Sequence, residues 1–168
     1  MTEIGAEAGF DELAYRRALG GFGTGVALVA AEDEAGRAHG LIINSLTSVS
    51  LHPPIILWCL LNSCQAFSVF TDCASFSINI LGHEDQALAH QFSRRGDRII
   101  PPDQLVRMET GAPVLAAAVA SLDCRVRSHD RVGDHEVIFG DVAAYRAAPT
   151  GDALGYFRGR YVKLSSGN

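Results

Sequence analysis

The chain has 168 residues, of which 48% are hydrophobic and 20% charged, and its formal net charge is −5. A chain of this length and composition forms an apolar core and is neither disordered nor of low complexity. An acidic surface repels phosphate backbones and anionic lipids, and the longest apolar stretch, Pro53 to Leu61, is too short to span a bilayer. We therefore expect no nucleic-acid binding and no membrane binding.

The predicted elements begin with a helix over residues 10–19, where apolar residues recur at helical spacing and two glycines follow. Two short apolar segments, 26–31 and 38–43, flank a polar turn and predict a β-hairpin. Residues 55–61 form an unbroken apolar run, which is typical of a strand buried on both faces.

The middle of the chain predicts two helices on either side of one strand. Residues 65–71 favour a short helix, and residues 76–80 alternate between apolar and polar side chains, as in a strand. Residues 85–94 carry apolar side chains at helical spacing, with acids early and arginines late, which suits the helix dipole.

Most of the remaining chain predicts strands. Residues 121–129 alternate with a period of two, which indicates a half-buried strand with Asp123 on its polar side. A turn over 130–134 leads to a partner strand over 137–145, so a long antiparallel hairpin is expected. Many strands and few parallel crossovers predict a mainly β fold: a closed antiparallel barrel with two or three peripheral helices, in a single domain over residues 1–168.

The positions of the cysteines and histidines predict neither disulfide bonds nor a metal site. The four cysteines, at positions 59, 64, 73 and 124, form no C-x-x-C pair, and nothing suggests export. They are typical of reduced thiols in a cytoplasmic protein. The six histidines form neither an H-E-x-x-H motif nor a close cluster with cysteine, so no metal site is expected.

A glycine cluster from Gly20 to Gly25 invites comparison with the dinucleotide-binding fingerprint. That fingerprint follows a strand and opens a helix. Here the predicted helix comes first and the strand second, so a Rossmann site is excluded. A nicotinamide cofactor would therefore be held without the usual glycine turn and helix N-terminus.

The segment Asn44 to Ser50 packs five small polar side chains into seven residues between two apolar strands. Ordinary turns use Gly, Pro and Asp more freely, so this row of hydroxyls and one amide indicates a surface that hydrogen-bonds an anion or a heterocycle. The alternative is a β-strand whose polar side is simply solvated.

Several motifs follow one another in a fixed order along about residues 10–164. They are Thr24-Gly25-Val26, the Asn-Ser-x-x-Ser-x-Ser run from Asn44, Pro53-Pro54, Asn79-Ile80-Leu81, the helix with Gln86 to Phe92, Gly111 to Leu115, Gly133-Asp134-His135, and Tyr156 to Tyr161. In this order they resemble the flavin reductase-like family, the FMN-binding split barrel.

The resemblance implies a homodimeric reductase that uses NADH or NADPH to reduce FMN or FAD. It also implies a functional partner, a flavin-dependent monooxygenase that receives the reduced flavin. In such a reaction hydride passes directly from nicotinamide C4 to flavin N5, so positioning is the main task of the protein and no catalytic side chain is expected.

The resemblance also assigns candidate cofactor-binding residues. Asn44 and Ser45 would contact the isoalloxazine edge, and Ser48 and Ser50 would lie near the ribityl phosphate. His135 would lie at the nicotinamide end, although by itself it could be a turn residue exposed to water. The remaining candidates are Thr24, Asn62 and Ser63 for the flavin pocket, and Arg160 and Tyr161 close to His135.

Two positions depart from the family pattern. Ile42 stands where Thr is common, so a possible hydrogen bond to flavin is lost, and Leu46 stands where an aromatic residue is common. Flavin affinity or the choice between FMN and FAD can differ accordingly.

Three other functions stay open at this point. The same barrel could be a flavin carrier or sensor that does not turn over, or a flavoprotein whose tightly held flavin acts directly on an organic substrate. A small β-barrel interaction module without a ligand is the third.

Overall fold

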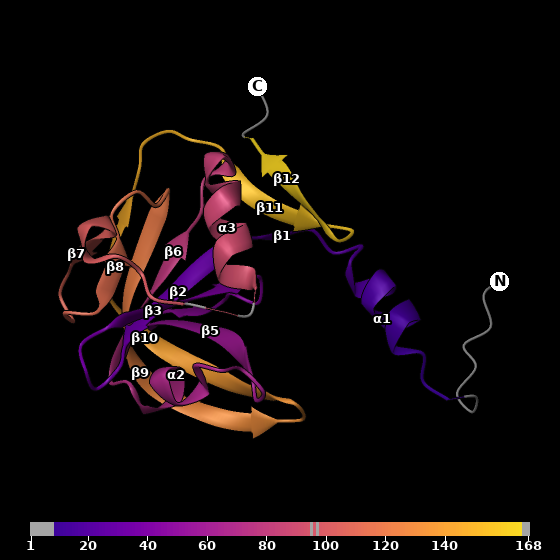
Figure 1. Cartoon of the computed structure of the whole chain (residues 1–168), viewed down its shortest axis with the longest axis horizontal. Coiled ribbons are helices and arrows are strands. Elements are labelled where there is room, and N and C mark those ends of the chain that lie inside the picture. Colours follow the sequence, from indigo (N-terminus) through magenta and orange to yellow (C-terminus); the bar gives the residue numbers. More distant parts are fainter. Residues whose placement is uncertain (1–8, 95, 97, 166–168) are drawn as a thin grey trace.

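The computed structural model describes residues 9–94, 96 and 98–165. It is mainly β, with three α-helices (Figure 1). The helices are α1 (Glu12–Leu19), α2 (Phe67–Asp72) and α3 (Gln86–Ser93). The strands are β1 (Thr24–Gly25), β2 (Ala27–Glu32), β3 (Ala38–Ile43), β4 (Thr47–Leu51), β5 (Pro54–Leu61), β6 (Ser75–Ile80), β7 (Leu105–Arg107), β8 (Pro113–Leu115), β9 (Ala120–Val132), β10 (His135–Ala147), β11 (Ala153–Phe157) and β12 (Arg160–Leu164).

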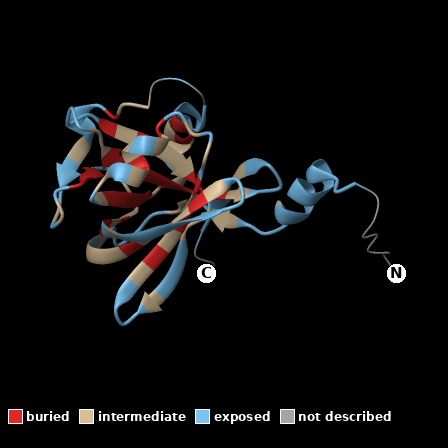
Figure 2. Ribbon diagram, turned by 90° about the horizontal axis from the view of Figure 1, so that it is seen from below, coloured by how far each residue is buried: buried red, intermediate tan, exposed pale blue. Residues whose placement is uncertain are grey.

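Helix α1 begins where the side chain of Asp11 accepts hydrogen bonds from the main-chain N–H groups of Leu13 (2.9 Å) and Ala14 (3.1 Å). Gly20 follows its last turn. The predicted helix over residues 10–19 is confirmed, but it buries none of its residues. Figures 1 and 2 show it standing away from the sheets.

The largest sheet has seven antiparallel strands in the order β3-β2-β6-β9-β10-β5-β4. The prediction of a closed barrel is wrong in one respect, since no hydrogen-bond ladder joins β3 to β4 among the described residues. These two edge strands are consecutive in the chain, and the four steps from Ile43 to Thr47 span roughly 14 Å at most. The sheet therefore curls until its edges lie near each other and stays open between them.

The long hairpin of β9 and β10 is confirmed and is longer than predicted. Val132 pairs with His135, so only Gly133 and Asp134 form the turn. Gly133 has φ of +61°, which two-residue hairpin turns require and glycine adopts without strain. The hairpin presents His135 beside Leu61, its partner at the end of β5.

Strand β5 is buried on one side only, so the prediction that both of its sides are buried is wrong. Trp58 and Leu60 are fully buried, whereas Cys59 is half-buried and Leu61 is 43% exposed. The buried side packs into an apolar core under α2, where the Trp58 ring meets Phe70 edge-on at 5.7 Å. The other side of β5 is half-buried or exposed and faces away from this core.

Polar groups inside the fold tie the β7–β8 segment to the large sheet. The fully buried Asn79 donates to the Leu28 carbonyl (3.0 Å) and to Ser77 Oγ (2.8 Å), and its oxygen accepts from the Leu115 amide (2.9 Å) and Ser121 Oγ (3.1 Å). Both N–H groups and both acceptor positions of this amide thus have hydrogen-bond partners.

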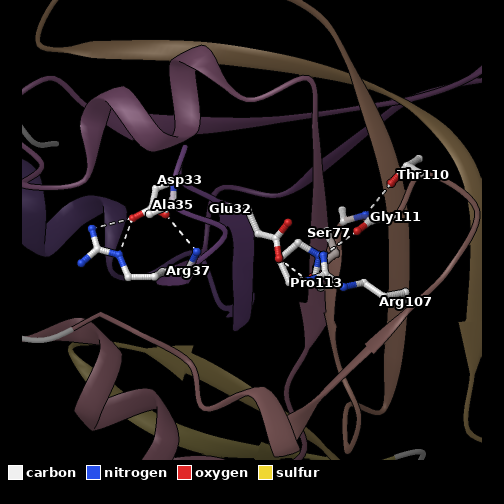
Figure 3. A network of polar contacts seen from close by, with 10 residues as sticks. Glu32, Asp33, Ala35, Arg37, Ser77, Arg107, Thr110, Gly111 and Pro113 are labelled. Carbon is white, nitrogen blue, oxygen red and sulfur yellow. Dashed lines mark hydrogen bonds and ion pairs between the residues drawn. The ribbon is translucent and has the colours of Figure 1, made fainter.

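The same segment covers Asp123, which is fully buried although the sequence places it on the polar side of β9. Its carboxylate accepts from the main-chain N–H of Thr110 at 2.7 Å and from the Thr110 hydroxyl. Figure 3 shows a second attachment, in which Arg107 reaches Glu32 at the end of β2 and the Gly111 carbonyl. A polar side can therefore be buried when another segment supplies its hydrogen bonds.

Replacing Asn79 tests how far the fold depends on this amide. Asn79→Ala leaves a buried carbonyl and a buried N–H without partners, so we expect the free energy of unfolding to fall by about 3 kcal/mol. Chemical denaturation followed by tryptophan fluorescence measures this. Gln91→Ala, a comparable truncation at an exposed position of α3, is the control. A loss below about 1 kcal/mol for Asn79→Ala would contradict this view of the core.

Candidate functional site

The corner between β3 and β4 consists of Asn44, Ser45 and Leu46. Thr47 pairs with Leu57, so continuing the antiparallel register backwards sets Ser45 opposite Cys59. At that place the Ser45 hydroxyl accepts a hydrogen bond from the Cys59 main-chain N–H at 3.0 Å. A side chain thus takes the place of a strand carbonyl, and the ladder ends there.

The main-chain N–H groups of the corner form no hydrogen bond within the described part of the chain. Those of Asn44, Ser45 and Leu46 donate to no group among the described residues. Unpaired main-chain donors are normally satisfied by water or by a ligand. Three consecutive donors at one bend suit a heterocycle whose edge carries carbonyl oxygens and ring nitrogens.

Three pockets meet at this corner, and Ile43 and Asn44 line all of them. The first, lined by His90 and Tyr161, is called the α3–β12 pocket and has a volume of about 570 Å³. The second, lined by Cys59 and His135, is called the β5–β10 pocket and has a volume of about 400 Å³. The third, lined by Thr24, is called the β1 pocket and has a volume of about 530 Å³. Each lies within the range of small-molecule sites, roughly 300–1,000 Å³. Adjoining pockets of this size offer space for two ligands in contact.

The α3–β12 pocket has an aromatic wall. The rings of His90 and Tyr161 meet edge-on with centroids 4.9 Å apart, and the Tyr156 ring lies 5.6 Å from that of Tyr161. Arg160 and Gln86 also line this pocket. Helix α3 supplies Gln86 and His90 one turn apart, so both face the same way.

The β5–β10 pocket is polar. His135 lies in its wall, and the Nδ1 atom of its ring is 2.8 Å from Asp134 Oδ1. This hydrogen bond lowers the pKa of the exposed Asp134 carboxyl. Nδ1 is thereby engaged, which leaves Nε2 for another contact. Ser63 and Arg98 also line this pocket.

The β1 pocket contains an unsatisfied polar atom. Thr24 Oγ1 is shielded from solvent and has no hydrogen-bond partner among the described residues. Thr24 lines this pocket together with Ser45 and Leu46. With the free N–H groups of the corner, this hydroxyl fits a ligand rich in acceptors and donors, such as an isoalloxazine with its ribityl chain.

The structure thus brings together seven of the ten residues predicted from the sequence to bind cofactors. Ser48 and Ser50 lie on the edge strand β4 and line none of the three pockets, and the Asn62 amide instead donates to the Gly133 carbonyl (3.3 Å). His135 lies in a different pocket from Arg160 and Tyr161. The residues in or between the pockets are Thr24, Asn44, Ser45, Ser63, His135, Arg160 and Tyr161.

Sequence reasoning missed several pocket residues. Gln86, His90 and Ser93 occupy successive turns on one side of α3, a spacing visible in the sequence, yet only the structure shows that this side faces a pocket. Arg98 had no such signal, because it follows the helix in an irregular segment.

The four cysteines are free and fall into two pairs with different surroundings. Burial raises the pKa of the Cys73 thiol to about 11 and that of the Cys124 thiol to about 12, so both stay protonated at neutral pH. Cys59 and Cys64 are half-buried and line the β5–β10 pocket.

Thiol labelling tests whether this pocket binds a ligand. We expect maleimide to label Cys59 and Cys64 in preference to Cys73 and Cys124, and saturating flavin or NADH to slow that labelling at least several-fold. Peptide mass mapping with Cys59→Ser and Cys64→Ser as references assigns each site. Labelling of both thiols that neither flavin nor NADH slows would contradict ligand binding there.

Comparison with known proteins gives the family. The profile described as "Flavin reductase like domain" matches residues 19–165. The chain is 34% identical to FMN reductase (NADH) SmoA of Agrobacterium fabrum, over 94% of this chain and 88% of that protein.

Solved structures agree. The styrene monooxygenase flavin reductase SMOB of Pseudomonas putida S12 superimposes with a TM-score of 0.81 at 32% identity, over 92% of this chain and 99% of that one. The NADH:FAD oxidoreductase SgcE6 of Streptomyces globisporus, solved with NAD and FAD fragments, gives a TM-score of 0.83 at 29% identity, over 92% and 93%. Coverage is not always so complete, since the chain spans only 53% of a related solved chain from Sinorhizobium meliloti. The predicted resemblance is confirmed, and the chain belongs to the flavin reductase-like family.

Proposed function

We propose that the protein is an NAD(P)H-dependent flavin reductase that supplies reduced FMN or FAD to a partner flavin-dependent monooxygenase. The observation that carries this proposal is the corner of free main-chain N–H groups at Asn44 to Leu46, where three pockets adjoin. The names of two relatives support flavin reduction and the partner: SmoA is an FMN reductase (NADH), and SMOB is the flavin reductase of a monooxygenase.

When both ligands are bound, the nicotinamide supplies hydride from C4 and the flavin accepts it at N5. The protein residues have to bring the two rings into contact and exclude water between them. We assign the isoalloxazine edge to Asn44, Ser45 and the corner N–H groups. His135 lies in an adjoining pocket, as the proposed nicotinamide contact requires. No proton has to be transferred in this step, so no general acid or base is assigned.

The walls around the corner favour a flavin that is exchanged rather than one that is permanently held. Ile42 and Ile43 line the α3–β12 and β5–β10 pockets and offer no hydrogen bond. All three pockets share Ile43 and Asn44 and adjoin one another. Loose binding suits a reductase whose product must leave for another protein.

We also infer that the protein acts as a homodimer, and that α1 and the residues around it lie in the interface. Phe10 is 74% exposed, Leu13 58%, Leu19 55% and Phe22 77%. Large apolar side chains gathered on and beside a helix that buries none of its own residues mark an interaction surface. A second copy of the chain is the occupant that the family resemblance implies.

Anaerobic mixing with NADH and either FMN or FAD tests the reductase. We expect the flavin to lose its visible absorbance over many turnovers, and Asn44→Ala to raise the KM for flavin about 10-fold because contacts at the corner are lost. Gln91→Ala is the control, since Gln91 is exposed on α3 and lines none of the three pockets. Absence of bleaching with both flavins and both nicotinamide nucleotides would refute the proposal.

Light scattering after size-exclusion chromatography tests the dimer. We expect twice the mass of the 17.9 kDa chain for the wild type and the single mass for the double variant Leu13→Asp with Leu19→Asp. Glu12→Gln, which keeps the apolar side chains, is the control. A monomeric wild type at micromolar concentration would contradict this part of the proposal.

A further inference from the structure

The end of the β9–β10 hairpin that carries His135 is held by few buried side chains. In the stretch 127–137, which the structure describes throughout, Glu136 is the only buried residue. The turn is fastened to β5 by Asn62, whose main-chain N–H donates to the Asp134 carbonyl at 2.9 Å. The position of His135 therefore depends on a small number of hydrogen bonds rather than on apolar packing.

Glu136 points away from the β5–β10 pocket. Successive side chains of a strand point to opposite sides, and His135 lines that pocket. Glu136 therefore lies on the other side of β10, together with the fully buried Ile138 and with Leu60, its fully buried partner on β5. A carboxylate among apolar side chains loses its hydration, which is unfavourable unless a hydrogen-bond donor replaces the water.

His129 supplies the hydrogen bond to Glu136. The Nδ1 atom of His129 and the Oε1 atom of Glu136 are 2.7 Å apart. His129 stands opposite Ile138 on β9, so the bond runs diagonally between the two strands. The Glu136 side chain is 10% exposed and that of His129 is 40% exposed, so the histidine keeps contact with water. The pair thus joins β9 to β10 close to the turn.

The pair also fixes how β9 and β10 are aligned. Their register shifts between Phe139 and Gly140, so the segment from this irregularity to the turn is aligned separately from the rest of the hairpin. A slip of one residue turns every side chain of a strand to the opposite side. Such a slip of β10 would turn His135 out of the pocket, and the bond between Glu136 and His129 would be lost. The observed hydrogen bond therefore stabilises the alignment that directs His135 into the pocket.

We propose that His129 and Glu136 form a positioning pair, which holds the His135 imidazole in the β5–β10 pocket and thereby strengthens binding of the nicotinamide nucleotide. Neither member of the pair lines this pocket, so both act through His135. A buried polar pair adds little stability compared with apolar residues of similar volume, and its contribution here is to select one conformation. The inference rests on the proposed function, because it needs His135 beside the nicotinamide.

Replacement of Glu136 tests the inference. Glu136→Leu removes the hydrogen bond but suits the apolar surroundings, so we expect a denaturation midpoint no lower than that of the wild type. Its Kd for NADH, measured by NADH fluorescence, should rise about 5- to 10-fold, and its Kd for FMN, measured by flavin fluorescence, should change less than about 2-fold. Glu136→Gln, which keeps an acceptor for His129, should bind both ligands nearly as the wild type does. Asp130→Asn is the control, since Asp130 is exposed on β9 next to His129.

Replacement of His129 gives a reciprocal test. His129→Leu should weaken NADH binding as much as Glu136→Leu does, and the double variant should weaken it no further, because each change breaks the same hydrogen bond. His129→Asn, which keeps a side-chain N–H donor, should retain most of the wild-type affinity. The comparison of His129→Leu with His129→Asn also decides the matter if Glu136→Leu does not fold.

The inference is overturned by an unchanged Kd for NADH in folded Glu136→Leu and His129→Leu, by an equal loss of FMN and NADH affinity in these variants, or by a wild type that does not bind NADH. Bleaching of FMN by NADH in the wild type tests the proposed reductase separately. Bleaching combined with unchanged NADH binding in the variants would refute the positioning role alone, whereas absence of bleaching with altered NADH binding would refute the reductase alone.

Discussion

Ser45 ends the ladder between β4 and β5 with a hydroxyl, and the rest of the site depends on this contact. Its Oγ accepts from the Cys59 N–H at 3.0 Å where a strand carbonyl would otherwise lie. This hydrogen bond holds the corner against β5 without closing the sheet, and the chain continues from Ser45 into β4. Had β3 and β4 paired, the N–H groups at the bend would be consumed by the ladder. The opening in the sheet and the candidate binding site are thus the same feature.

An open sheet edge is usually a liability, because unpaired main-chain groups invite aggregation. Here the edge of β3 is partly covered, because Gly40 and Ala38 hydrogen-bond to the segment after α3, and α3 and the β11–β12 hairpin supply walls beside the corner. The close packing of Phe92 over Gly40 holds α3 in place. The buried Asn79 amide joins β2 and β8 to β6 through hydrogen bonds to Leu28 and Leu115. A rigid frame around an open bend is what a site that only positions two ligands requires.

The spacing of apolar residues predicted most of the helices and strands. In residues 10–19, 85–94 and 121–129 this spacing is visible within the segment itself and needs no knowledge of distant contacts. The polar run from Asn44 marked the corner because small hydroxyls are unusual between two apolar strands. Burial of Asp123 and the open edge of the sheet were not predictable, because they depend on segments distant in sequence. The place of Arg98 in a pocket wall was missed for the same reason, because the main-chain hydrogen bond that holds it beside β3 leaves no sequence pattern.

A crystal structure of the protein with FMN tests the central claim most directly. The claim predicts the isoalloxazine edge within hydrogen-bonding distance of the N–H groups of Asn44 to Leu46, roughly 3 Å, with the ribityl chain extending into one of the three adjoining pockets. A flavin bound elsewhere, for example in the separate hollow lined by Asp33, His39 and Cys73, would contradict it. The open corner would then be a structural irregularity with no part in flavin binding.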